Sequence, residues 1–144
     1  MGGLAAFVAL VLVIMAVATG CGGGSASPES VVREWSDALN AGDNERAADL
    51  FAPNAEVVQP GQVLKLRTHA EAVAWNSSLP CAGQIVSIKT AGRTATATFE
   101  LGDRRNSRCD GPGQRATAIF RVVKGKIVLW HQTATPDAPP PPEI

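Results

Sequence analysis

Residues 115–133 read RATAIFRVVKGKIVLWHQT and form two strand-like segments on either side of Lys124-Gly125. β-branched and aromatic residues are frequent in both segments, which is typical of strands. The glycine tolerates the positive φ that a tight two-residue hairpin turn requires. The stretch therefore predicts an antiparallel hairpin of Arg115–Val123 and Lys126–Thr133.

Regular pairing across this turn sorts the side chains onto two faces of the hairpin. The more apolar face, which we expect to be the core face, holds Ala116, Ala118, Phe120, Val122, Ile127, Leu129 and His131. The opposite face holds Thr117, Ile119, Arg121, Val123, Val128, Trp130 and Gln132. Its strip of Ile119, Val128 and Trp130 is either a homodimer or partner interface, or one residual apolar patch on a monomer.

A second hairpin precedes the first in the chain, with strands Gln84–Thr90 and Thr94–Leu101 around a turn near Gly92. The same alternation predicts a core face of Val86, Ile88, Ala95, Ala97, Phe99 and Leu101. The opposite face is polar, and Ile85 is its only large apolar residue. Arg104, Arg105 and Arg108 follow this hairpin, and their acidic neighbours suggest a solvated loop.

Helices are expected in the first half of the domain. Ser27, Asp43 and Thr68 each offer an N-cap side chain, and Glu71 completes a capping box with Thr68. The predicted elements are helices from Pro28 to Asn40, from Asp43 to just before Pro53, and from Thr68 to Ser78, with a short hairpin of residues 56–59 and 63–66.

This order of elements resembles the nuclear transport factor 2-like superfamily, which includes the SnoaL-like polyketide cyclases. The stretches Ala41–Val57 and Ile119–Ile127 carry the resemblance. It implies an α+β, cone-shaped fold over residues 28–135, in which a curved antiparallel sheet wraps around three N-terminal helices. The resemblance also implies an apolar pocket at the open end and dimers through the outer sheet face. Members include isomerases, hydrolases and non-catalytic binders, so the fold does not choose an activity.

Candidate catalytic residues are few. The chain contains no tyrosine, so the Tyr donor of the steroid-isomerase members is missing, and no metal or nucleotide motif is present. His131 is the candidate for a general base, assisted by Glu56 or Asp49, and the alternative is that it is a hydrogen-bonded core histidine. We expect His69, in the first turn of a helix, to be exposed.

The aromatic residues, with His131, are the candidates for a binding pocket. The candidates for lining an apolar pocket, or alternatively for simple core packing, are Trp35, Trp75, Phe99, Phe120 and His131. Because the Tyr donor is missing and no set of polar side chains converges, the favoured function is a non-catalytic domain that binds a small apolar ligand or a protein partner, without cofactor or metal. The alternatives are an isomerase or hydratase that uses His131, and a structural interaction domain. The net charge of zero gives no indication of a nucleic-acid partner.

The beginning of the chain predicts export. Residues 4–18 form an uncharged apolar run that is too short to span a bilayer comfortably. The following Ala18-Thr19-Gly20-Cys21 resembles the lipobox of bacterial lipoproteins. We expect a signal peptide at 1–20, lipid on Cys21, a flexible tether at 21–27 and a Pro-rich tail at 136–144. The protein would then be anchored on the extracytoplasmic side of the bacterial cell envelope.

The three cysteines fit this interpretation. Lipidation of Cys21 leaves Cys81 and Cys109 to pair in an oxidising compartment. The strand register of the earlier hairpin brings both of these residues to one end of the sheet, so the sequence predicts a disulfide between them.

Overall fold

The computed structural model describes residues 26–135, which form one six-stranded sheet and three helices. The predicted signal peptide, Cys21 and the Pro-rich tail lie outside the described residues. The elements are α1 (Pro28–Asn40), α2 (Asn44–Asp49), β1 (Phe51–Gln59), β2 (Gln62–Leu66), α3 (His69–Ser78), β3 (Ala82–Ala91), β4 (Thr94–Gly102), β5 (Arg115–Val123) and β6 (Lys126–Thr133). None of these helices has the length and apolar composition needed to cross a bilayer.

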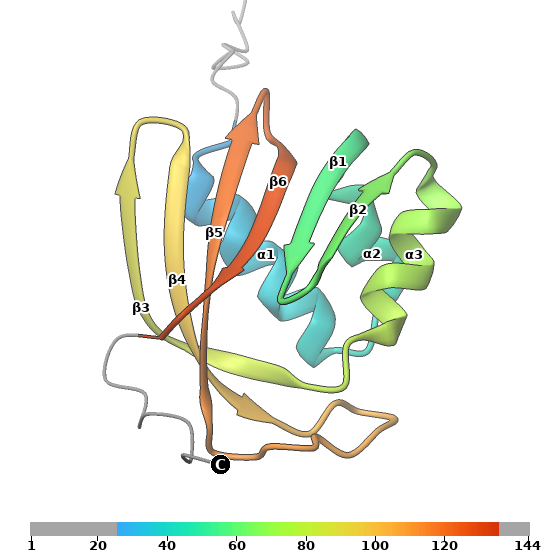
Figure 1. Ribbon diagram of the computed structural model, residues 1–144, viewed down its shortest axis with the longest axis vertical. Coiled ribbons are helices and arrows are strands. Elements are labelled where there is room, and N and C mark those ends of the chain that lie inside the picture. The colour runs from blue at the N-terminus through green and yellow to red at the C-terminus, as the bar shows by residue number, and fades with distance from the viewer. Residues whose placement is uncertain (1–25, 136–144) are drawn as a thin grey trace, which may run out of the picture.

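The sheet is curved and open, with the strand order β2-β1-β6-β5-β4-β3 (Figure 1). The α+β, nuclear transport factor 2-like fold is confirmed, but the prediction of a wholly antiparallel sheet is wrong. β1 runs parallel to β6, and Val57 lies opposite Trp130. The β1–β2 hairpin joins the sheet through β1, which pairs with β6, the last strand of the described residues.

The helices begin at their predicted caps. The side chains of Ser27, Asp43 and Thr68 each accept a hydrogen bond from a backbone N–H in the first helical turn. α2 ends at Asp49, before its predicted end, and Phe51 already belongs to β1. α1 packs against β3, β4 and β5, whereas α2 packs against α1 and α3 (Figure 1).

Aromatic rings form the centre of the core between α1 and the sheet. The ring of Trp35 lies 6.0 Å from Phe99, 5.3 Å from Phe120 and 6.3 Å from Trp130, measured between centroids. Trp75 on α3 lies 5.0 Å from Trp130. Most of these pairs meet edge to face, which adds about 0.5–1.5 kcal/mol per pair beyond the burial of apolar area.

The β3–β4 hairpin contains one extra residue in β3. Ile85 pairs with Phe99 and Ser87 with Thr98, so Val86 has no partner. Ile85 therefore joins the face of buried Phe99, and Val86 is 43% exposed. The predicted faces of Ile85 and Val86 are wrong, because a bulge reverses the alternation on one side of it.

The β5–β6 hairpin contains a corresponding extra residue, Val128. Its turn has positive φ at both Lys124 and Gly125, as a two-residue hairpin requires. Val122 pairs with Ile127, whereas Arg121 pairs with Leu129, and the bulge reverses all faces from there on. The predicted faces are therefore wrong for four residues, Leu129, Trp130, His131 and Gln132.

Two of these corrections matter for function. Trp130 pairs with Phe120 and is 7% exposed, so it belongs to the core face and not to an outer interface. His131 pairs with Ile119 on the outer face and is not a core residue. Ile119 and Val128 remain half-buried on that face, and a dimer through it stays a prediction.

Candidate functional site

A pocket of about 270 Å³ lies between α1 and the sheet, at the end where β4 and β6 finish and β3 and β5 begin. Its apolar walls come mainly from α1, β4 and β6. The large apolar lining residues include Trp35, Leu39, Phe99, Leu101 and Trp130, and the polar ones include Gln59 and Gln132. A cavity of this size is close to the lower end of the range for small-molecule sites.

The structure brings together only part of the predicted pocket set. Trp35 and Phe99 line the pocket, but Trp75 and Phe120 do not. Phe120 is completely buried beneath the other rings, and Trp75 packs against Phe51 and Trp130. His131 is also absent from the lining, because the bulge at Val128 turns it to the outer face.

Several pocket residues were not predicted from the sequence, among them Leu39, Leu101 and, the largest, Trp130. Alternation along β6 placed it outside the core, and a bulge in the middle of an apolar strand has no clear signature in the sequence. Only the size of the indole suggested burial, since fully exposed tryptophans are uncommon.

Ala82 and Gly83, the first residues of β3, line the pocket between α1 and β4. Gly83 accepts a hydrogen bond from Asn40 Nδ2 at 2.9 Å and a longer one from Ser36 Oγ at 3.4 Å. A Cβ at Gly83 would lie 2.6 Å from the carbonyl oxygen of Glu100. Glycine is therefore required where β3 passes this close to β4.

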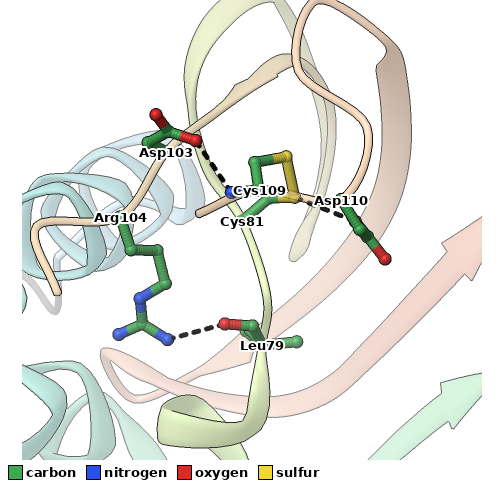
Figure 2. Close-up of a disulfide and its surroundings, with 6 residues drawn as sticks. All are labelled: Leu79, Cys81, Asp103, Arg104, Cys109 and Asp110. Carbon is green, nitrogen blue, oxygen red and sulfur yellow. Dashed lines mark hydrogen bonds between the residues drawn. A yellow bond between two sulfur atoms is a disulfide. The ribbon is translucent and has the colours of Figure 1, made fainter. Parts of the chain in front are cut away.

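A disulfide lies at the edge of the pocket. Cys81 and Cys109 are bonded with an S–S distance of 2.00 Å, as the sequence predicted. Figure 2 shows that the backbone N–H of Cys109 donates to Asp103, at 2.8 Å, which closes the loop on itself. Cys81 and Asp110 line the pocket, so this crosslink holds one part of its rim.

Arg104 fastens the same loop to the helices. Its guanidinium donates to the carbonyl oxygens of Asn76, at 2.5 Å, and Leu79, at 3.0 Å, as well as to the side chain of Asn44 (Figure 2 shows the bond to Leu79). Burial lowers the pKa of Arg104 from its ordinary value. The carbonyls belong to the C-terminal end of α3, where the helix dipole favours a cation. The expectation that Arg104 lies in a solvated loop is wrong, because these carbonyls replace its water.

The sequence profile of the SnoaL-like domain matches residues 32–130. The chain belongs to the SnoaL-like domain family. No curated protein matches it, whereas many solved structures share its fold.

Three of these structures show how far the likeness extends. A nuclear transport factor 2-like protein of unknown function from Cytophaga hutchinsonii has a TM-score of 0.63 and 14% identity, covering 76% of this chain and 91% of its own. A candidate polyketide cyclase from Sinorhizobium meliloti has a TM-score of 0.61 and 18% identity, with coverages of 72% and 94%. A candidate ketosteroid isomerase from Kribbella flavida has a TM-score of 0.60 and 18% identity, with coverages of 81% and 83%.

The SnoaL-like pocket contains little acid–base chemistry. Asp110 is the only lining residue with an acidic or basic side chain, and it is exposed at the mouth. His69 is also exposed, and its Nε2 lies 2.8 Å from Asp49 Oδ1 on α2. His131 therefore lies outside the pocket, and Asp49, one of its two candidate acids, pairs with His69 instead. Glu56, the other candidate, lies opposite Leu129 in the β1–β6 pair and is also absent from the pocket lining.

A metal centre has little support in the described part of the chain. The one grouping there of at least three potential ligand side chains is Cys81, Cys109 and Asp110. Both sulfurs of that group are joined in the disulfide, and metal ions bind thiolates rather than disulfide sulfurs.

Proposed function

We propose that this SnoaL-like protein is a non-catalytic binding protein for a small, mainly apolar ligand. The observation that carries the proposal is the pocket of about 270 Å³, whose walls are largely aromatic and aliphatic. Most of the lining is apolar, with a few polar groups, which is the usual composition of a small-molecule site.

The proposal excludes general acid–base catalysis because that chemistry needs a titratable group within hydrogen-bond reach of the reacting atom. Asp110, on the rim, is the only such group in the lining, and it faces solvent. The alternative enzyme using His131 has no support from the geometry, since His131 lies on the opposite side of the sheet. The names of the cyclase and isomerase relatives favour a small organic ligand over a macromolecule.

We also propose that lipid on Cys21 holds the domain on the outer face of a bacterial membrane. Support comes from the apolar run at 4–18 followed by Ala-Thr-Gly-Cys. The bond between Cys81 and Cys109 adds to it, because such crosslinks persist in oxidising compartments outside the cytoplasm. Mass spectrometry of the protein from membranes tests this: the expected N-terminus is an acylated Cys21, and an unmodified Cys21 would contradict it.

Calorimetric titration of the purified full-length protein with acetylnaphthalene, an apolar ring compound, tests ligand binding. We expect saturable binding that Leu101→Trp abolishes, because the larger ring fills the pocket from its rim. The matched control is Val63→Trp, at a position that is 66% exposed on β2. Absence of binding to the wild type, or equal binding by both variants, would refute a ligand site in this pocket.

A further inference from the structure

The turn between β3 and β4 and the turn between β5 and β6 lie together at one end of the sheet, opposite the end that holds the pocket (Figure 1). The backbone N–H of Val122 donates to the carbonyl oxygen of Arg93 at 2.8 Å, which joins the two hairpins next to their turns. α1 begins at the same end, since a Cβ at Gly125 would lie 3.7 Å from the backbone nitrogen of Ala26. The described chain therefore starts beside these turns.

Basic side chains are concentrated around the two turns. The hairpin sequences on either side of them, residues 84–99 and 115–135, contain no aspartate and no glutamate. Five basic residues lie in the turns or within three residues of them, and all five are exposed: Lys89, Arg93, Arg121, Lys124 and Lys126. We call this group the basic end. The net charge of zero does not show that positive charge is concentrated here.

The acidic side chains of α1 and α2 closest to this end face other partners. Glu29 of α1 lies 2.7 Å from Arg33. Glu45 and Asp49 of α2 lie 3.7 Å and 2.8 Å from the two ring nitrogens of His69. No ion pair within residues 26–135 includes a side chain of the basic end. Its positive charge can therefore meet an anionic partner.

The predicted lipid anchor is attached to the domain at the basic end. Cys21 precedes Ala26 by five residues, and a chain of that length spans at most about 18 Å when fully extended. Lipid on Cys21 would therefore keep the turn of Lys124 and Gly125 close to the bilayer surface. Lysine and arginine are attracted to anionic lipids within a Debye length, which is about 10 Å at 0.1 M salt.

We propose that the basic end docks on the anionic phospholipid headgroups of the membrane that carries the lipid on Cys21. The phosphate oxygens of the headgroups accept hydrogen bonds from its guanidinium and ammonium groups. This inference rests on the proposed lipid anchor and adds to it the surface of the domain that faces the membrane. Docking in this orientation directs the pocket, at the opposite end of the sheet, away from the bilayer.

Acylation of lysines by a small neutral reagent tests the docking in the wild-type protein. The protein is purified from membranes and reconstituted into vesicles of zwitterionic phosphatidylcholine, or of phosphatidylcholine mixed equally with anionic phosphatidylglycerol. Mass spectrometry then measures how fast each lysine reacts. Lys124 should react at least about fivefold more slowly on the anionic vesicles, because the headgroups cover its amine.

Two controls belong to this measurement. Lys65 lies exposed on β2, which β1 separates from the two hairpins, and should react equally on both kinds of vesicle. In 1 M salt the Debye length falls to about 3 Å, so the difference at Lys124 should disappear. Neither control needs a variant, so the test does not depend on the folding of one.

Charge removal at each end of the sheet locates the contact. Arg93→Gln with Arg121→Gln should bring the Lys124 ratio to about one, because each lost charge weakens the attraction about fivefold. Arg105→Gln with Arg108→Gln removes two exposed charges from the loop after β4, at the opposite end, and is the matched control that should keep the ratio.

The possible failures are distinguishable. Protein that associates with neither kind of vesicle would overturn the lipid anchor and this inference together. Protein that associates with both, with equal reactivity of Lys124 on the two, would overturn the docking and leave the anchor standing. Loss of the ratio only in the control with Arg105→Gln and Arg108→Gln would place the contact at the other end and also overturn the docking.

Discussion

The β3–β4 and β5–β6 hairpins each contain one extra residue, but the two bulges have very different consequences. Val86 in β3 turns outward and is exposed. Only the short part of β3 that precedes it, which includes Ile85, changes face relative to regular alternation. Val128 in β6 reverses the residues that follow, bringing Trp130 into the core and His131 out of it. The effect of a bulge therefore depends on which side chains lie beyond it.

The two hairpins are also held differently. The start of β3 is fixed by the disulfide of Cys81 and, through Leu79, by the guanidinium of Arg104. The end of β6 is fixed by ring packing of Trp130 against Trp35 and Trp75. One hairpin thus depends on covalent and polar contacts, and the other depends on aromatic burial.

Deletion of Val128 should have the largest effect on stability. A regular β5–β6 pairing would turn Trp130 to the outer face and leave a cavity in the aromatic core. The expected loss is about 3–5 kcal/mol in the free energy of unfolding, as for removal of a buried aromatic side chain. Urea denaturation measures it.

Two controls sharpen this comparison of the bulges. Val128→Ala keeps the extra residue and should cost about 1 kcal/mol or less, since Val128 is only half-buried. Deletion of Val86 should cost less than deletion of Val128, because only the half-buried Ile85 and its neighbours change face. If both deletions lowered the free energy of unfolding equally, the burial of Trp130 would not be what makes the β6 bulge important.

Replacing both disulfide cysteines, Cys81→Ser with Cys109→Ser, should have the next largest effect. The residues are 28 positions apart, and closing a loop of that length is worth about 3–4 kcal/mol. The loss, measured by urea denaturation, should match that of the reduced wild type. Full stability after reduction would show that the start of β3 does not depend on this bond.

Arg104→Met should cost about 2–3 kcal/mol, because hydrogen bonds from a charged donor are lost and the buried carbonyl of Asn76 keeps only the longer bond from the Leu79 N–H. Arg105→Met is the matched control at an exposed neighbour and should change stability by about 0.5 kcal/mol or less. Thermal unfolding monitored by circular dichroism compares the two. Similar values would contradict the fastening role of Arg104.

His131→Ala should have the smallest effect. His131 is half-buried on the outer face and does not line the pocket, so we expect unchanged binding of acetylnaphthalene and a stability change of about 0.5 kcal/mol. Calorimetric titration measures the affinity. A large loss of binding would instead support His131 as a ligand or catalytic residue.

Local signals in the sequence predicted much of this fold. The caps at Ser27, Asp43 and Thr68 marked where helices begin, and Lys124-Gly125 marked the last turn, because both kinds of signal act over a few residues. The disulfide followed from the number of cysteines and the hairpin register. The pocket residues Trp35 and Phe99 were among the candidates because aromatic side chains on core-facing positions were identifiable.

What the sequence by itself determined is therefore the element order, the α+β class, the helix starts, the hairpin turn and the cysteine pair. Tertiary structure alone decided the parallel pairing of β1 with β6, the faces of Trp130 and His131, and the burial of Arg104. The physical reason is that alternation assumes a regular ladder. A single extra residue interrupts the ladder when the free energy gained by burying a large ring exceeds that lost with the strand pairing. That balance depends on residues distant in the chain.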